Sequence, residues 1–570
     1  MRRRDFLAAT FAALAVQAAP ATMRPAAAQA QKRRFIDVHC HLFNAHDLPI
    51  RGFLEQVVLP ADHKHAKQVK MHESTFRELT KILIDFIRHD TPTPKKEELL
   101  LTEIANRSAM APTRAMREVS ERELMKTILR EIWWPKETQD KIRMRVGGNY
   151  ISGVALIQIK REILGEIFKD LKPDRENDPT MLEITPDYAA DQLYESNGPL
   201  GRGFRWAMLF IRNRFELVDN LHALHQGRTE LLTPALVDLS LWVGDEDHHS
   251  IHDQMQVLEQ ISLRRQGVRV HGFIPFCPLR QATHFQRRRM EVEPIKTVKD
   301  AIGEGDKPGK GFIGVKLYPP MGFRPAANAK LGDRFPKRTA LAVLKDETGE
   351  KIDAALWDLF GWCAANDVPV MAHCNNSYGS APGYAERSHP KYWRPVLENP
   401  ERSRLRINLA HFGDFDEAFE KGKLKPKGAE QSWEWEVGRM WEDFPDAKIY
   451  ADISYFSEIY ENSGHRRDVA RLLAQFRERF PMAAKRLMYG SDWMMVGLEE
   501  KFSNRYPDDI AEFLRRDAGF GNAELDDILF GNAADFLGLR MADREKGTRG
   551  RLERFYAFHN LDAGWLEKFA

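Results

Sequence analysis

The sequence contains few cysteines, only four in 570 residues. No two of them have the C-x-x-C spacing of a structural zinc knuckle, and the chain lacks the dense cysteine framework of small disulfide-bonded secreted domains. We interpret all four as small buried apolar residues, and the predicted fold requires no disulfide between them. They are Cys40, Cys277, Cys363 and Cys374.

The sequence also lacks a charge imbalance, since its formal net charge is only +2. A nearly neutral chain of this length offers no extended surface for nucleic acid or another polyanion, so we expect no nucleic-acid partner. Three catalytic motifs are missing as well: a glycine-rich phosphate loop, a G-x-S-x-G elbow and an H-E-x-x-H helix. The serine-hydrolase and zincin classes therefore have no support.

Long apolar runs are absent except at the N-terminus, where residues 1–30 predict a twin-arginine signal peptide. Arg2-Arg3-Arg4-Asp5-Phe6-Leu7 has the twin-arginine form, and the apolar stretch from Phe6 to Ala19 is too short for a spanning helix. Ala28-Gln29-Ala30 is a cleavage site of the A-x-A type. We therefore expect the twin-arginine export machinery as a partner, a periplasmic or otherwise exported location and no stable membrane insertion. An uncleaved membrane anchor is the alternative.

Beyond the signal, strand-like and helix-like segments alternate in a way that predicts an α/β protein, a (β/α)8 TIM barrel with a large helical insertion after the first strand. The barrel covers residues 31–43 and 231–540, the insertion or cap residues 44–230, and a C-terminal helical tail residues 541–570. The insertion either packs on itself or covers the active site. A doubly wound open sheet is the alternative fold. The eight expected strands are Phe35 to His41, Leu231 to Leu241, Val268 to Phe276, Phe312 to Leu317, Val368 to His373, Leu405 to His411, Lys448 to Ile453 and Arg486 to Gly490.

Four of these strands end in side chains that bind metals. His39 and His41 are two residues apart on the first strand, so both imidazoles project from the same face. His373, His411 and Asp492 lie at the ends of the fifth, sixth and eighth strands. These ends can converge on one cation only if the strands form a closed ring. The pattern therefore favours the barrel and predicts a metal centre at its mouth.

The same segments resemble the amidohydrolase superfamily. They are most similar to its amidohydrolase-related group, which includes aminocarboxymuconate semialdehyde decarboxylase. The resemblance covers the first strand and about Leu231 to Leu539, but not the helical insertion or the tail. It rests on Val38-His39-Cys40-His41, Ala372-His373, Ala410-His411, Gly490-Ser491-Asp492-Trp493 and the closing segment from Ile528 to Leu539.

The resemblance implies a role for each strand-end residue. His39, His41 and His373 would bind a divalent metal, and Asp492 would contact it and accept a proton from its bound water. His411 would be a ligand of a second metal or the residue that polarises the substrate. Independently of the family, three imidazoles and a carboxylate leave an open position on a zinc-like ion, where the pKa of water falls to about 7.

Lys316 takes the place where two-metal members of the superfamily carry a carboxylated lysine. We interpret it as a plain lysine near the substrate, with a carbamate between two metals as the alternative. Arg324 and Asn375 are further candidates for substrate binding, and an arginine suits a carboxylate. Asp238, Arg280 and Asn376 are candidates as well, and for each of these five residues a loop salt bridge or cap is the alternative. Asp37 orients a ligand or caps its strand. The acidic loop with His248, His249 and His252 is expected to be exposed.

Together these patterns predict a metal-dependent hydrolase, with Zn²⁺ as the expected ion (one or two ions), in which activated water attacks an ester, lactone or amide-type bond of a small-molecule substrate. A metal-dependent non-oxidative decarboxylase is the alternative, and a non-catalytic metal-binding barrel is a third. The substrate is not readable from the sequence. The oligomeric state is not readable either, although a homodimer is compatible with it.

Overall fold

The strands are short runs of branched and aromatic residues, and almost every residue in them is buried. Strands buried on both faces are expected in parallel sheets covered by helices. The computed structural model describes residues 33–53, 73–106, 114–133, 144–146, 149–151, 157–161, 163–165, 184–196, 198–245, 250–284, 292–336, 344–376, 379–412, 415–460, 463–496, 505–545 and 547–569. The signal-peptide prediction falls on residues 1–30 and lies outside these ranges.

Two parallel sheets form the centre of the protein. The larger has six strands in the order β15-β14-β11-β10-β9-β6, and the smaller has three in the order β1-β4-β5. All of their pairings are parallel. Their bounds are β1 (Phe35–Cys40), β4 (Thr229–Pro234), β5 (Arg269–Val270), β6 (Phe273–Pro275), β9 (Gly314–Leu317), β10 (Val370–His373), β11 (Arg406–Ala410), β14 (Lys448–Ile453) and β15 (Leu487–Tyr489).

Only a few backbone hydrogen bonds between described residues connect the two sheets at their edges. On one side Ala235 forms an isolated parallel bridge with Phe273. On the other side the amides of Ser491 and Asp492 donate to the carbonyl oxygen of His39, at 3.1 and 2.8 Å. The mixed α/β class with a six-stranded parallel sheet is therefore confirmed. A closed ring of eight paired strands stays a prediction, because these edges are joined by a few contacts and not by ladders.

Two of the expected strands differ from the structure. The second ends at Pro234 and not at Leu241, because the chain turns into helix α11 (Ser240–Val243). The third is divided into β5 and β6. At the division Gly272 packs so closely that a Cβ there would lie 2.9 Å from the carbonyl oxygen of Pro234.

The insertion after β1 is mainly helical, as expected, but it also contains the antiparallel hairpin β2 (Met144–Val146) and β3 (Asn149–Ile151). The helix expected from Phe204 to Leu224 is broken in two, because Asn213 and Glu216 form a capping box that begins a new helix. The insertion helices are α1 (Ile50–Phe53), α4 (Glu73–Asp90), α5 (Pro94–Ala105), α6 (Arg114–Ile132), α8 (Pro186–Glu195), α9 (Pro199–Leu209) and α10 (Arg214–Leu224).

The helices that follow β4 pack around the two sheets, and two small antiparallel pairs, β7–β8 (Gly303–Glu304, Lys307–Pro308) and β12–β13 (Phe419–Glu420, Lys423–Leu424), lie among them. These α-helices are α12 (Ile251–Ser262), α13 (Pro278–Thr283), α14 (Pro294–Ile302), α16 (Thr348–Ala365), α17 (Arg394–Leu397), α18 (Trp433–Asp443), α19 (Ser463–Arg479), α20 (Ala483–Arg486), α21 (Trp493–Val496), α22 (Tyr506–Arg516), α23 (Asn522–Asp526), α24 (Asn532–Leu537) and α25 (Thr548–Phe558).

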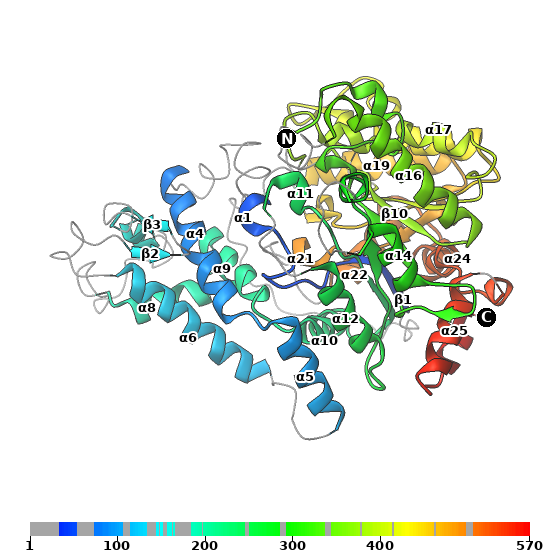
Figure 1. Cartoon of the computed structure of the whole chain (residues 1–570). Helices are drawn as coiled ribbons and strands as arrows, with labels where there is room; N and C mark the ends of the chain where they lie inside the picture. Colours follow the sequence, from blue (N-terminus) through cyan, green and yellow to red (C-terminus); the bar gives the residue numbers. More distant parts are fainter. Residues whose placement is uncertain are drawn as a thin grey trace, which may run out of the picture.

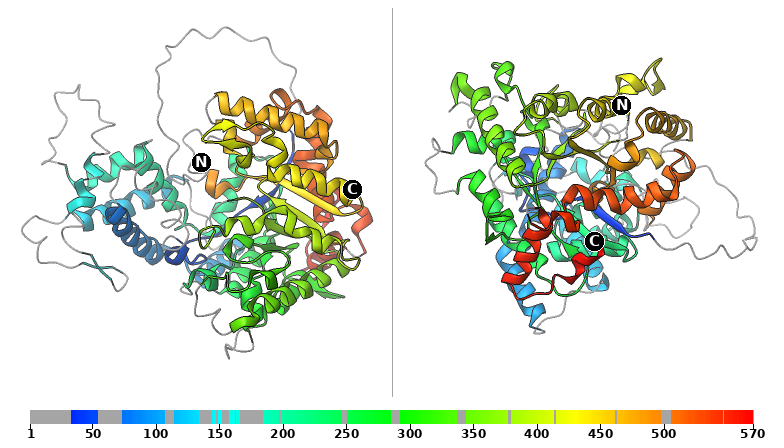
Figure 2. Two further views of the ribbon diagram at one scale, coloured as in Figure 1. Left: turned by 90° about the horizontal axis from the view of Figure 1, so that it is seen from above. Right: turned by 90° about the vertical axis from the view of Figure 1, so that its right-hand side faces the viewer.

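The insertion and the C-terminal helices lie at opposite ends of the molecule. Figure 1 shows α4, α6, α8 and α9 on one side of the sheets and α24 and α25 on the other. In the right-hand view of Figure 2 the C-terminal helices lie nearest the viewer, across the end of the sheets. Their side chains Phe536, Phe555 and Phe569 share one buried cluster with strand residues such as Ile36 and Met488. The tail thus closes the end of the sheets away from the insertion.

Candidate metal centre

His39 and His41 lie at the end of β1, where their side chains share one face of the strand as the spacing predicts. Both are buried, and their ring centroids are 5.3 Å apart. The Nδ1 atom of His41 lies 2.7 Å from the carbonyl oxygen of Ala235. A carbonyl only accepts, so His41 carries its proton on Nδ1 and leaves Nε2 with a free lone pair.

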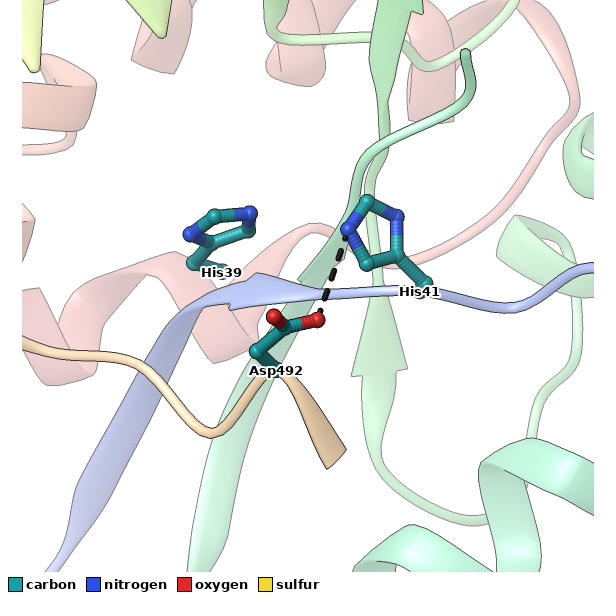
Figure 3. Close-up of side chains that lie close together, drawn as sticks. All are labelled: His39, His41 and Asp492. Atoms are coloured by element: carbon teal, nitrogen blue, oxygen red, sulfur yellow. Dashed lines mark ion pairs between the residues drawn. The ribbon is translucent and has the colours of Figure 1, made fainter. Parts of the chain in front are cut away.

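Asp492 completes a trio with these histidines. It lies two residues after Gly490. Its Oδ1 lies 3.5 Å from Nε2 of His41, and the ligand atoms of His39, His41 and Asp492 all lie within 4.8 Å of one another. Figure 3 shows the three side chains meeting from β1 and from the segment after β15. The structure therefore brings together residues that are about 450 positions apart in the chain.

Two residues of this region have a backbone conformation that non-glycine residues rarely adopt. The φ angle is +43° at Asp492 and +72° at His411. Such left-handed residues cost of order 1–3 kcal/mol and gather at functional sites when the surrounding structure holds them. Here the amide of Asp492 donates to the carbonyl of His39, and the amide of His411 donates to Asp452 at 3.1 Å. Hydrogen bonds within the site thus hold both turns.

His373 and His411 stand beside the trio, at the end of β10 and directly after β11. Their ring centroids are 4.5 Å apart, and that of His411 is 4.6 Å from that of His39. The ring of Tyr318 lies 4.4 Å from His373 on its other side. All four expected histidines therefore belong to one cluster, although His373 is not part of the compact trio.

Lys316 points into the same cluster from β9. Its Nζ lies 3.0 Å from Nε2 of His39 and 3.3 Å from the sulfur of Met371, and the side chain is 2 % exposed. Burial lowers the pKa of this ammonium to about 8, against the attraction of Asp452 and Asp492. The lysine is thus adjacent to the proposed ligands, where either a plain amine or a carbamate would act.

Burial also shifts the pKa values of the cluster. It lowers the pKa of His39, His373 and His411 well below the usual range, and that of His41 to about 3. It raises the pKa of Asp492 to about 7, and the charge of Lys316 opposes this rise. The histidines are therefore neutral near pH 7, which is the form that binds a metal.

Two residues at the end of β14 belong to the site but were not among the expected ones. The Oδ1 of Asp452 lies 3.3 Å from Nδ1 of His39, and its Oδ2 accepts from the side chain of Asn408 at 2.6 Å. The Oγ of Ser454 lies 2.9 Å from Nδ1 of His39 and 3.0 Å from Nδ1 of His411. The sequence signal that could have revealed Asp452 and Ser454 is the one that revealed the histidines, a buried strand that ends in polar residues.

Asp37, expected to orient a ligand or cap the strand, ties β1 to the segment after β15. Its carboxylate accepts from the amide of Ser491 at 2.9 Å and from the hydroxyl of Ser491 at 2.6 Å. Burial raises its pKa to about 7, although the bonds to Ser491 oppose this. The residue therefore supports the site by fixing the position of the residue before Asp492.

The five candidates for substrate binding other than Lys316 lie outside the compact trio. Arg280 pairs with Asp238 through two hydrogen bonds of 2.7 and 3.0 Å, as a loop salt bridge would. The guanidinium of Arg324 lies 4.1 Å from the ring centroid of Tyr392. Asn375 is buried. The side chain of Asn376 donates to Glu417 at 3.3 Å.

The remaining sequence features fall outside the site. His252 is exposed on α12, as expected, while His248 and His249 lie outside the described residues. The four cysteines are buried free thiols. Within the ranges that the structure describes, no helix is both long and apolar enough to cross a bilayer.

The residues present fit a divalent metal ion. Two imidazole nitrogens and a carboxylate oxygen form the donor set that zinc and related first-row ions prefer. Among the described residues, Oδ1 of Asp492 is buried without a hydrogen-bond partner. A buried carboxylate oxygen without a donor is costly, and a cation would compensate it.

A small cavity adjoins the cluster at Lys316. Its volume of about 10 Å³ holds about one water molecule. Its walls are Asp238, Trp242, Cys277, Tyr318 and Phe323 together with Lys316. The space beside the cluster is therefore narrow and has both aromatic and charged walls.

Comparison with known proteins finds one family model that is similar to part of the chain. Residues 305–539 match the amidohydrolase family model. The matched segment includes Lys316, His373, His411 and Asp492 but not β1, and it is less than half of the chain. No curated protein matches the chain.

One solved structure from Lactobacillus casei, which carries a proposed assignment as a metal-dependent hydrolase, is similar at 14% identity and a TM-score of 0.34. The match covers 70% of this chain and 92% of that one. A likeness of this size supports no argument about function. The support for the amidohydrolase resemblance is thus the match over residues 305–539 and the geometry of the cluster.

Proposed function

We propose that the protein is a metal-dependent hydrolase of the amidohydrolase superfamily that cleaves an ester, lactone or amide-type bond of a small molecule. The observation that carries this proposal is the buried trio of His39, His41 and Asp492, whose ligand atoms lie within 4.8 Å of one another. The amidohydrolase match over residues 305–539 supports it. We further propose that the two sheets act as one (β/α)8 barrel with the trio at its mouth.

His39, His41 and Asp492 would hold the ion, and we propose His373, whose ring centroid lies 4.5 Å from that of His411, as a further ligand. We propose Zn²⁺, because imidazole and carboxylate donors suit it. When bound, such an ion lowers the pKa of a coordinated water and polarises a carbonyl oxygen. His41 already has the tautomer that binds a metal through Nε2, because the carbonyl of Ala235 holds its proton on Nδ1.

Asp492 would act as the general base. Its buried Oδ1 lacks a donor among the described residues, so it is open to accept a proton from the attacking water. It would then deliver that proton to the leaving group. His411 and Lys316 border the same space and would polarise the substrate carbonyl or hold its charge.

Assays on the purified protein test this proposal. A panel of esters, lactones and amides is incubated with protein loaded with Zn²⁺ in ¹⁸O-labelled water. Incorporation of ¹⁸O into the acid product, lost with a chelator and in the Asp492→Asn variant, is the expected result. Release of carbon dioxide from a carboxylic acid substrate, with no ¹⁸O in the product, would contradict hydrolysis and support the decarboxylase.

We also propose that the protein is exported through its N-terminal twin-arginine segment. Support comes from Arg2-Arg3-Arg4-Asp5-Phe6-Leu7 and the Ala28-Gln29-Ala30 site. The route carries folded proteins, so a metal could be loaded before export. Replacing Arg3 and Arg4 by lysine is expected to retain the protein in the cytoplasm with its signal uncleaved, and unchanged export would contradict the proposal.

A further inference from the structure

The hydrogen-bonding pattern around His39 determines which of its ring nitrogens carries the proton. Nε2 faces the ammonium of Lys316 at 3.0 Å, and Nδ1 faces the carboxylate oxygen of Asp452 at 3.3 Å. An ammonium only donates and a carboxylate only accepts. Both neighbours therefore require the same tautomer, with the proton on Nδ1. Binding of a metal through Nε2 requires this tautomer as well.

Through Ser454, the tautomer of His39 determines the tautomer of His411. Its Oγ is within hydrogen-bond distance of Nδ1 of His39, at 2.9 Å, and of Nδ1 of His411, at 3.0 Å. Since His39 carries its proton on Nδ1, this single N–H is shared between two acceptors, the carboxylate of Asp452 and the hydroxyl oxygen of Ser454. The single hydroxyl proton of Ser454 is then available for His411, and Nδ1 of His411 accepts it. His411 must consequently carry its own ring proton on Nε2.

We infer that Ser454 is a positioning residue that holds His411 as the Nε2-protonated tautomer, so that His411 donates a hydrogen bond to the substrate and does not bind a second metal. The inference rests on the proposed function. A histidine binds a metal only through a nitrogen that carries no proton, and the unprotonated Nδ1 of His411 is already engaged by Ser454. The centre then takes one ion, and Lys316 remains a plain amine.

The backbone holds this chain in place. The amide of His411 donates to Asp452, whose other oxygen accepts from Asn408, so the carboxylate is fixed between the two histidines. Asp452 lies at the end of β14 and Ser454 directly follows that strand, and Ser454 is 1 % exposed. Water therefore has little access to compete for the hydroxyl.

The first test reads the tautomer directly in resting protein. ¹⁵N NMR of protein labelled at histidine, with His411 assigned by the spectrum of His411→Gln, is expected to show a protonated Nε2 and an unprotonated Nδ1. In Ser454→Ala the two nitrogens of His411 are expected to lose this distinction. A protonated Nδ1 in the wild type would overturn the inference. Because this readout needs no substrate, it remains decisive even if the proposed hydrolysis fails.

The second test uses metal content and kinetics. Zn²⁺ titration is expected to saturate at about one ion per chain in the wild type and in Ser454→Ala. In Ser454→Ala kcat is expected to fall about 10- to 100-fold with KM nearly unchanged, and Ser454→Thr to restore most of it. The matched control is Ser262→Ala, which removes another buried hydroxyl that bonds the carbonyl of Leu258 at 2.9 Å. A second ion that disappears in His411→Ala, or full kcat in Ser454→Ala, would overturn the inference.

Discussion

Trp206 of the helical insertion donates its indole N–H to the carbonyl oxygen of Met494 at 2.7 Å. Met494 lies two residues after Asp492, so this bond connects α9 directly to the segment that carries the proposed base. A second indole hydrogen bond reaches the end of β1, where Trp493 donates to the carbonyl oxygen of His41 at 2.6 Å. The insertion therefore contacts the main chain that carries the proposed metal ligands.

We predict that Trp206→Phe weakens metal binding while the aromatic packing survives. The ring still packs on Phe210, whose centroid is 4.7 Å away, but the hydrogen bond to Met494 is lost. A hydrogen bond of this kind contributes about 1 kcal/mol, which corresponds to about a fivefold rise in the Kd for Zn²⁺. Competition with a chromophoric chelator measures it.

Trp133→Phe is the matched control for that variant. The indole of Trp133 donates to the carbonyl of Ile184 at 3.0 Å, within the insertion and away from the ligands. It should lower stability by a similar amount and leave the Kd unchanged. An equal effect of both variants on the Kd would refute a specific link between α9 and the metal centre.

A buried ion triad holds the insertion together, and we predict a large loss of stability when it is broken. Arg214 is fully buried, bonds Asp47 at 2.8 Å through Nε, and bonds Glu97 at 2.5 Å. Arg214→Met leaves two buried carboxylates without their charged partner, although backbone amides still donate to both, and this costs about 3–5 kcal/mol. Urea unfolding measures the change in the free energy of unfolding.

The exposed pair of Arg130 and Asp187, 2.7 Å apart, supplies the comparison. Both side chains are about half exposed and solvent screens their attraction, so Arg130→Met should destabilise the protein far less than Arg214→Met. The account of the triad fails if the two variants lose the same stability.

Gly490→Ala is predicted to damage the metal centre through sterics alone. A Cβ at this position would lie 2.8 Å from Cβ of His39 and 3.1 Å from Cβ of Ser454. The strands carrying these residues must then separate, and we expect the Kd for Zn²⁺ to rise at least tenfold. In α16, Gly361→Ala meets only a guanidinium nitrogen of Arg402 at 3.6 Å, so it should bind zinc normally. Normal zinc binding by Gly490→Ala would contradict the close packing.

The C-terminal helices should make stability depend on pH through His271. Its ring is buried, with Nδ1 2.8 Å from the carbonyl of Gly311 and Nε2 3.0 Å from the hydroxyl of Tyr556. Burial lowers its pKa to about 4, against an ordinary value of 6.5, although the bond to Gly311 opposes this and the charge of Arg269 adds to it. The unfolded chain thus binds the proton more tightly, and the stability contributed by the neutral ring, present above pH 6.5, is lost as the pH falls towards 4.

Unfolding free energies measured between pH 4 and 6.5 test this dependence. His271→Gln should flatten the curve by up to about 1.4 kcal/mol per pH unit, the value for one proton. Tyr556→Phe keeps the imidazole buried and should keep the slope. Equal slopes for the wild type and His271→Gln would show that this ring does not contribute.

The sequence was sufficient to predict that these side chains come together, because each part of the cluster is a local pattern. A buried apolar run followed by a histidine or aspartate is visible at His39, His373, His411 and Asp492, and parallel strands place such ends together. Asp452 and Ser454 follow the same rule, but one carboxylate and one hydroxyl at a strand end are also ordinary caps. Their role depends on distances to two histidines, which no local pattern encodes.

The differences in the fold have a similar origin. The division of the third strand at Gly272 depends on how closely Pro234 approaches, and this is a tertiary contact. The break between α9 and α10 was visible in principle, because Asn213 and Glu216 have the spacing of a capping box. The apolar periodicity that continues across it concealed the break.

The most direct test of the account is the metal content of the purified protein by inductively coupled plasma mass spectrometry. The wild type is compared with a variant in which His39, His41 and Asp492 are all alanine, each stripped with chelator, reloaded with Zn²⁺ and desalted. We predict about one zinc ion per chain in the wild type and none in the variant, with both proteins folded by circular dichroism. Equal zinc content in the two folded proteins would contradict the claim that these residues form the metal centre.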